Sequence, residues 1–113
     1  MKKLLPRIVY QMCVHGGLIV GSQARRLAGE DVKPNDWDIL VPIDRWWAVA
    51  SFIPGDATPN KFGGWRFESD GIEIDVWPDT VMNYLTRCKN SGGSVLVVDF
   101  INNRVFSSRF QEV

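Results

Sequence analysis

Two aspartates separated by one residue stand in the segment Asp36-Trp37-Asp38-Ile39. On a β-strand, residues i and i+2 point to the same face, so these two carboxylates would lie roughly 6–7 Å apart along one side of the strand. Acids this close on a largely apolar strand repel each other, and a bound cation relieves the repulsion. Carboxylate oxygens are ligands that Mg²⁺ prefers. The pair therefore predicts a divalent-cation site, and the alternative is a solvated strand with two acids.

A second acidic strand is expected in Ile72-Glu73-Ile74-Asp75-Val76-Trp77, where the aliphatic residues alternate with Glu73 and Asp75. The preceding Asp70-Gly71 is typical of a two-residue hairpin loop. Such a loop would place Arg66 opposite Asp75 and Glu68 opposite Glu73, although like charges across a ladder are unfavourable. One face of the sheet would then hold Asp36, Asp38, Glu68, Glu73 and Asp75, with Arg66 among them. The alternative is the solvated face of an ordinary antiparallel hairpin.

A third feature is Ile19-Val20-Gly21-Ser22, an apolar strand that runs into a Gly-Ser turn and then a helix. Backbone N–H groups and a hydroxyl at such a helix N-terminus favour an anion. The turn therefore predicts a phosphate site at Gly21 and Ser22, with Arg25 in reach. A plain strand–helix turn is the alternative.

The combination resembles the signature of the DNA polymerase beta-like nucleotidyltransferase superfamily. That signature is a hydrophobic residue, Gly and then Gly or Ser, a spacer of about a dozen residues, and Asp-hydrophobic-Asp-hydrophobic. Here Val20-Gly21-Ser22 is followed by thirteen residues and then Asp36-Trp37-Asp38-Ile39. Ala24-Arg25 is similar to the extended Gly-Ser-x-Ala-Arg form, and Ile74-Asp75-Val76 is similar to the third carboxylate strand. The resemblance covers about residues 5–88. The chain is closest in size to the minimal members, and its motif region also resembles the head domains of larger tRNA- and antibiotic-modifying members.

The resemblance implies a two-metal transfer of a nucleoside monophosphate from a nucleoside triphosphate. Asp36 and Asp38 would hold both Mg²⁺ ions, and Asp75 would complete the metal that activates the acceptor hydroxyl and accept its proton. Gly21 and Ser22 would hold the phosphates. The acceptor implied is tRNA, a partner protein or a small molecule. Arg25, Arg66 and Trp77 are the further candidates for contact with the nucleotide.

The chain also departs from the family. Trp37 is bulkier than the usual aliphatic residue between the aspartates, and only a helix and a hairpin follow Asp75, where larger members have a helical domain. The rival interpretation is therefore a catalytically inactive nucleotidyltransferase-fold module that binds a nucleotide or a protein. An interaction surface would use the Trp46-Trp47 helix and the C-terminal hairpin, whose edge strand would pair with a second copy in a homodimer.

The expected fold class is α/β (α+β), with a mixed or antiparallel sheet flanked by helices and an extra C-terminal hairpin. The 113 residues are expected to form one domain, with a core over residues 5–88 and the hairpin over 95–110. Helices are predicted over residues 4–14, 23–28, 44–52 (with Asp44 as N-cap) and 78–88. Strands are predicted over residues 18–20, 36–41, 65–68, 72–77, 95–100 and 104–110, the last two turning at Asn102-Asn103. A long loop is predicted over residues 53–64.

Acidic and basic residues number 13 each, so a strong sequence-independent attraction to nucleic acid is not expected. No export signal or membrane segment is apparent, and the two cysteines form no CxxC pair. A cytoplasmic protein is therefore expected.

Strand alternation places Trp37 and Trp65 in the core, and Trp77 on the acidic face, where it is the candidate for stacking on a base. Trp46 and Trp47 are adjacent on a helix, so one of them is expected to be exposed. The last helix is expected to bury Val81, Tyr84 and Leu85.

Overall fold

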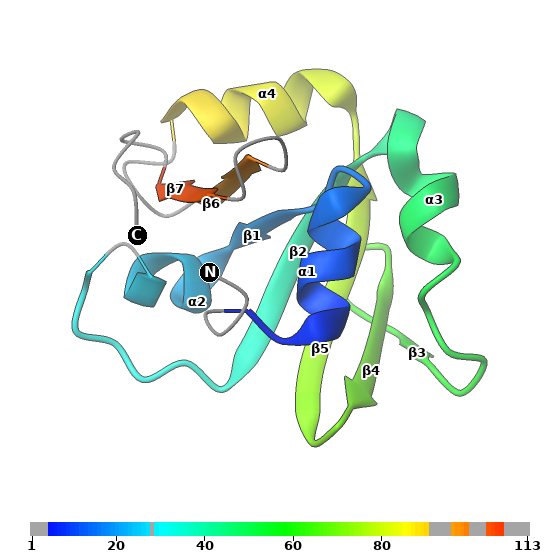
Figure 1. The fold of residues 1–113 in the computed structure, drawn as a ribbon. Coiled ribbons are helices and arrows are strands. Elements are labelled where there is room, and N and C mark those ends of the chain that lie inside the picture. Colours follow the sequence, from blue (N-terminus) through cyan, green and yellow to red (C-terminus); the bar gives the residue numbers. More distant parts are fainter. Residues whose placement is uncertain (1–4, 28, 91–95, 100–103, 108–113) are drawn as a thin grey trace.

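The computed structural model describes residues 5–27, 29–90, 96–99 and 104–107. Within them the chain has an α+β fold with one mixed sheet, as expected (Figure 1). The strands are β1 (Leu18–Val20), β2 (Asp36–Pro42), β3 (Thr58–Pro59), β4 (Trp65–Ser69), β5 (Ile72–Asp79), β6 (Leu96–Asp99) and β7 (Arg104–Ser107). The helices are α1 (Arg7–Val14), α2 (Gly21–Leu27), α3 (Trp46–Ala50) and α4 (Val81–Asn90), with a 3-10 turn η2 (Ile43–Arg45) before α3.

The strand order in the sheet is β3-β4-β5-β2-β1-β6-β7, which puts β2 in the middle. Strand β2 pairs in parallel with β5 and antiparallel with β1, and the other neighbours are antiparallel. The β4–β5 hairpin has the predicted two-residue loop. Asp70 and Gly71 both have positive φ, 52° and 78°, as a type I′ turn requires. Arg66 therefore lies opposite Asp75 and Glu68 opposite Glu73, as predicted.

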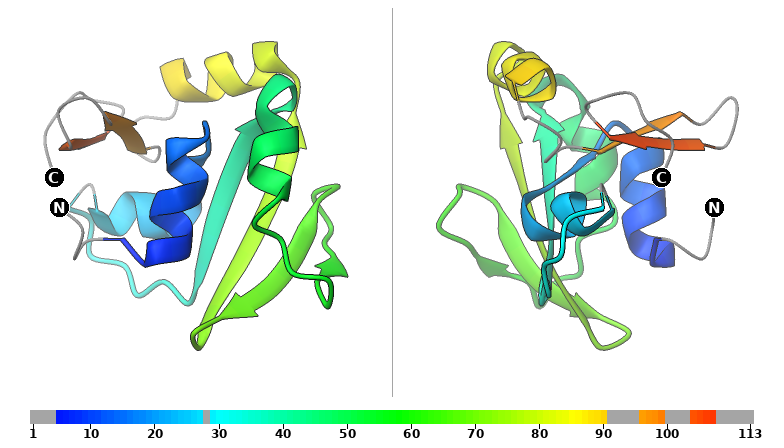
Figure 2. Two further views of the ribbon diagram at one scale, coloured as in Figure 1. Left: turned by 45° about the vertical axis from the view of Figure 1, so that its right-hand side comes forward. Right: turned by 90° about the vertical axis from the view of Figure 1, so that its left-hand side faces the viewer.

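The two faces of the sheet are covered differently. Helices α1, α2 and α3 pack on the face that presents Trp37, Ile39 and Val41, and together they form the larger core. The opposite face has a smaller apolar cluster of Leu18, Val20 and Leu40. Trp77 from β5 and Tyr84 from α4 pack against this cluster. Figure 2 shows α1 and α4 on opposite sides of the sheet. Only part of the second face is apolar, and the remainder is the acidic face.

Two predicted helix starts are wrong. Asp44 does not cap a helix, because residues 43–45 form the 3-10 turn and no side chain caps α3. Pro78 is not in α4 but pairs with Val41 at the end of β5. Helix α4 begins three residues later because the hydroxyl of Thr80 accepts a hydrogen bond from the backbone N–H of Asn83 at 3.1 Å, the geometry of an N-cap.

Two predictions of burial are also wrong. Trp65 is 38% exposed, because β4 lies near the edge of the sheet and only β3, of two residues, continues beyond it. On α4, Val81 and Leu85 are 38% and 55% exposed, and Tyr84 alone of the three predicted residues is partly buried. Trp37 is in the core and Trp47 is 75% exposed while Trp46 packs on the core, as predicted.

The C-terminal hairpin is confirmed over residues 96–99 and 104–107, and the predicted turn at Asn102-Asn103 lies outside the described residues. In the part of the chain that the structure describes, no helix is both long enough and apolar enough to cross a membrane.

Candidate active site

The parallel pairing of β2 with β5 arranges the acidic face in rows. Asp36 lies opposite Glu73 in the first row, and Asp38 lies opposite Asp75 in the second. Leu40 and Trp77 form the third row, where the face becomes apolar. All three predicted aspartates are therefore on one face, within two rows of the sheet.

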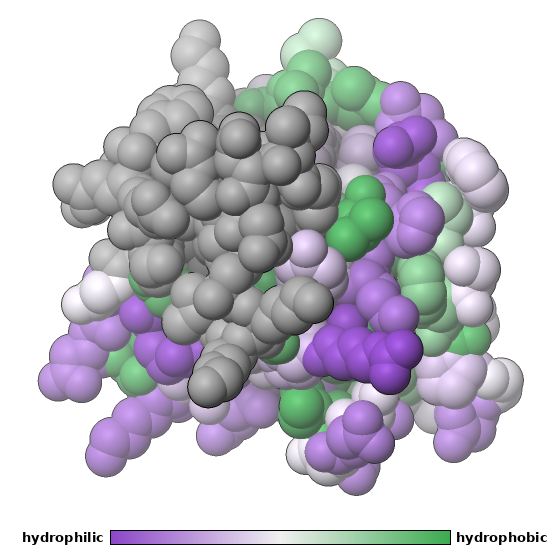
Figure 3. Space-filling view, viewed as in Figure 1, coloured by the Kyte–Doolittle hydropathy of each residue, from purple (hydrophilic) through white to green (hydrophobic). Residues whose placement is uncertain are grey.

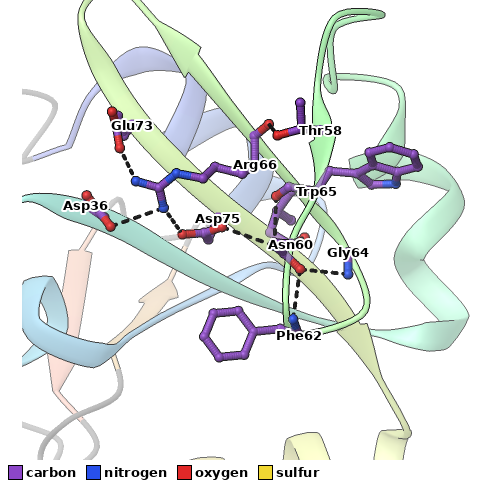
Figure 4. A network of polar contacts seen from close by, with 10 residues as sticks. Asp36, Thr58, Asn60, Phe62, Gly64, Trp65, Arg66, Glu73 and Asp75 are labelled. Atoms are coloured by element: carbon purple, nitrogen blue, oxygen red, sulfur yellow. Dashed lines mark hydrogen bonds and ion pairs between the residues drawn. The ribbon is translucent and has the colours of Figure 1, made fainter.

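Arg66 lies at the centre of an ion-pair network in these rows (Figure 4). Its Nη1 atom is 3.2 Å from Oδ2 of Asp36 and contacts Oδ2 of Asp75, and its Nη2 atom contacts Oε2 of Glu73. The hydrogen bond to Asp36 and the charges of Asp75 and Asp36 raise the pKa of Arg66 above its ordinary value. The side chain of Asp75 is only 7% exposed. Of the three acids in the network, it therefore has the least access to water and the greatest need of the positive charge of Arg66.

Of the three aspartates Asp36, Asp38 and Asp75 (the triad), Asp38 is the one outside this network. Among the described residues its side chain has no hydrogen bond or ion pair. Its pKa is raised by burial and by the neighbouring carboxylates of Asp75 and Asp36, while Arg66 and Arg87 act in the opposite direction. Arg87, from α4, is a residue that the sequence did not single out. A half-buried carboxylate with two acidic neighbours is a strong candidate for cation binding.

Gly21 directly adjoins Asp38. Its φ is +72°, and a Cβ atom added to it would lie 2.5 Å from Oδ2 of Asp38. The absence of a side chain therefore brings the turn backbone next to a carboxylate. Ser22 follows at the start of α2 and is partly exposed. The structure thus brings the predicted Gly-Ser turn beside the predicted aspartates, because Val20 pairs with Asp38.

Arg25 lies outside this cluster. Its Nε atom is 3.3 Å from Oε1 of Glu30, and both side chains are about half exposed, at 47% and 49%. An exposed pair of this kind contributes little stability, so Arg25 can exchange its partner at low cost.

Sequence reasoning missed Asn60, which supports Asp75 from the neighbouring loop. Its Nδ2 atom donates to Oδ1 of Asp75 at 3.2 Å and to the carbonyl oxygen of Trp65 at 2.9 Å. Its Oδ1 atom accepts from the N–H groups of Phe62 and Gly64 at 3.0 and 2.9 Å (Figure 4). The signal in the sequence was an Asn ahead of a Gly-Gly pair, since Asn side chains commonly bond to the backbone of their own turn.

The donor set suits Mg²⁺, since three carboxylates lie close together and Asp38 has no other partner among the described residues. Nonetheless, no three acidic, His or Cys side chains of the described residues are arranged to hold a metal ion. Figure 4 shows the guanidinium group of Arg66 between Asp36 and Asp75. Metal binding by all three aspartates would require Arg66 to move.

The surface beyond the site has apolar side chains along α4. Val81, Met82 and Leu85 are exposed there, and green atoms mark this edge in Figure 3.

Searches against protein-family models, curated proteins and solved structures found no match for this chain. The fold and the site together define an α+β protein with a carboxylate-rich sheet face beside a Gly-Ser turn.

Proposed function

We propose that this chain is a cytoplasmic, Mg²⁺-dependent nucleotidyltransferase with the nucleotidyltransferase fold. The observation that supports this most directly is the pairing of Asp38 with Asp75 next to Gly21. It puts the Gly-Ser turn and two carboxylates side by side, although the residues lie far apart in the sequence. Asp36 provides the third carboxylate from the adjoining row.

In this proposal Asp36 and Asp38 would hold two Mg²⁺ ions, and Asp75 would be the further ligand of one of them. When bound, such a pair of ions stabilises charge on the entering and leaving oxygens of an in-line displacement. Gly21 and Ser22 bind the β- and γ-phosphates through their backbone and hydroxyl groups. Arg25 would have to leave Glu30 before it could add positive charge at the phosphates.

The reaction forms a bond between the acceptor oxygen and the α-phosphorus of the nucleoside triphosphate. The bond from that phosphorus to the bridging oxygen breaks, and pyrophosphate leaves. Asp75 accepts the proton of the acceptor hydroxyl. Its Oδ1 atom is oriented by Asn60, and the movement of Arg66 would free Oδ2. Arg66 then remains paired with Glu73, or turns to the phosphates of the nucleotide.

The test is transfer of label from each of the four α-labelled nucleoside triphosphates, with Mg²⁺ and total cellular RNA and protein as acceptors. The wild type is compared with the Asp36→Asn/Asp38→Asn double variant. Glu68→Gln is the matched control, because it removes an exposed acid from the same sheet face but outside the network. We expect a labelled product from the wild type and the control, and none from the double variant.

Transfer that survives the double substitution would exclude the two-metal mechanism. Absence of transfer by the wild type, combined with nucleotide binding that needs Asp38, would favour the inactive binding module. The acceptor class follows from whether the label is sensitive to ribonuclease or to protease.

A further inference from the structure

Residues 60–64 form a loop whose shape is fixed by the side chain of Asn60. Besides the hydrogen bonds of its side chain to Phe62, Gly64 and Asp75, Asn60 donates its backbone N–H to the carbonyl oxygen of Gly64 at 3.0 Å. Gly64 packs so closely on β5 that an added Cβ atom would lie 2.5 Å from Cα of Trp77. The loop is thus held against β5 at the level of Asp75 and Trp77.

This loop presents an aromatic ring to solvent. Phe62 is 44% exposed, and its ring stacks on that of Trp77 with 4.5 Å between centroids and 28° between planes. Trp77 is supported by the apolar cluster of the same face. The Nζ atom of Lys61 lies over the Phe62 ring, 5.2 Å from its centroid. A partly exposed aromatic ring that is supported by a second ring and has a mobile lysine cation over it has the chemistry that binds a nucleobase and its phosphate once the lysine side chain turns aside.

The position of the loop relative to Asp36, Asp38 and Asp75 indicates whether the Phe62 ring contacts the donor nucleotide or the acceptor. Along the sheet order, the Gly-Ser turn follows β1, Asp38 is in β2, Asp75 is in β5, and the loop lies beyond β5 beside β4. The backbone of the loop that holds this ring is therefore on the Asp75 side of the site, and β5 and β2 separate it from β1 and its turn. In an in-line displacement the nucleophile enters opposite the leaving pyrophosphate. The acceptor, rather than the donor, would approach past Phe62.

We propose that Phe62, supported by Trp77 and flanked by Lys61, stacks on the terminal base of a single-stranded nucleic acid whose hydroxyl is the acceptor. This inference rests on the proposed function, because the direction of approach follows from the assigned phosphate turn. It replaces the sequence-based expectation that Trp77 stacks on the base of the donor nucleotide. The near-zero net charge of the chain makes stacking, rather than charge, the main source of affinity.

The experiment measures binding of short single-stranded oligoribonucleotides, labelled at the 5′ end, by fluorescence anisotropy without nucleoside triphosphate. Phe62→Ala should weaken binding on the order of tenfold, since loss of one stacking ring has about that effect. Phe62→Trp should restore the affinity, because any flat aromatic ring suffices. Trp47→Ala, which removes a 75% exposed ring on α3, is the control and should bind as the wild type does. Unchanged affinity of Phe62→Ala, or no binding by the wild type, would overturn the proposal.

A second arm measures the affinity of each nucleoside triphosphate for the same variants by calorimetry. We expect Phe62→Ala to leave these affinities unchanged. A variant that loses nucleoside triphosphate affinity but keeps oligonucleotide affinity would place the donor base on Phe62 and overturn the acceptor assignment. Oligonucleotide binding that needs Phe62 without any transfer activity would retain the base-stacking surface and reject the proposed function. Transfer to protein alone would reject the nucleic-acid acceptor while retaining the function.

Discussion

Asp38 and Asp75 lie directly opposite each other in the parallel pairing of β2 with β5, so two carboxylates from distant parts of the chain are side by side on one sheet face. The fold keeps them together although only Asp75 has a cationic partner among the described residues. Arg66 contacts Asp75, and among the described residues Asp38 forms no ion pair. This relationship leads to the first of four predictions.

Asp38→Asn should raise the melting temperature at neutral pH by a few degrees. The pKa of Asp38 is raised by burial and by Asp75 and Asp36, so the folded state binds the proton more tightly than the unfolded state. The contribution of Asp38 to stability is therefore fully present below the ordinary pKa of 3.8 and is lost as pH rises through the higher pKa of the folded state. The gain in melting temperature from Asp38→Asn should be present at pH values above the folded pKa of Asp38 and should vanish below its ordinary pKa of 3.8. Thermal unfolding followed across pH tests this, and destabilisation at neutral pH would contradict it.

Arg66→Gln should bind Mn²⁺ more tightly in the absence of nucleotide, by about tenfold or more. The guanidinium occupies the space between Asp36 and Asp75 as an internal cation, and its removal leaves the carboxylates free for a metal. Titration followed by the electron paramagnetic resonance signal of free Mn²⁺ measures the affinity. Arg25→Gln, which removes a cation paired with Glu30 away from the cluster, is the control. Weaker binding by Arg66→Gln would show that Arg66 does not compete with the metal.

Gly21→Ala should lower the free energy of unfolding by about 1–3 kcal/mol and abolish transfer. Position 21 has a φ of +72°, and the added methyl group would lie 2.5 Å from Oδ2 of Asp38. Urea denaturation measures the loss. Gly55→Ala is the control, because its backbone does not have positive φ and nothing lies within 4 Å of the added atom. Equal stability of the two variants would mean that the turn can shift away from Asp38.

Gly64→Ala should be destabilising by about 1–3 kcal/mol, as expected for overpacking. The new Cβ atom would overlap the carbonyl oxygen of Val76 and lie 2.5 Å from Cα of Trp77, both of them backbone atoms that cannot rotate away. The loop would separate from β5, and Asn60 would lose its contact with Asp75. Urea denaturation against Gly55→Ala gives the stability, and the fluorescence of Trp77 in a background lacking the other tryptophans reports the loss of Phe62 stacking. An unchanged spectrum would contradict a rigid loop.

The sequence was sufficient for those parts of the site that depend on local pattern. Strand alternation placed Asp36 and Asp38 on one face, and the Asp-Gly loop fixed the register that puts Arg66 opposite Asp75. Both follow from backbone geometry over a few residues. The same holds for Trp37 in the core.

The errors concern tertiary placement. Trp65 alternates correctly towards the core face, but its strand has only the short β3 beyond it, so the ring remains exposed. The ion pair of Arg66 with Asp36 depends on the parallel pairing of β2 with β5, which no local pattern specifies. Asn60 acts on a residue fifteen positions away. These contacts arise only from the assembled sheet.

The crossover between β2 and β5 also has a consequence for how the chain folds. Residue 36 pairs with residue 73, so the central pairing of the sheet closes a long loop, a slow step because chain entropy is lost before the contacts form. The same step first brings Asp38 and Asp75 together, so carboxylate repulsion opposes the closure itself. Divalent cations and low pH, which both relieve that repulsion, should therefore accelerate refolding.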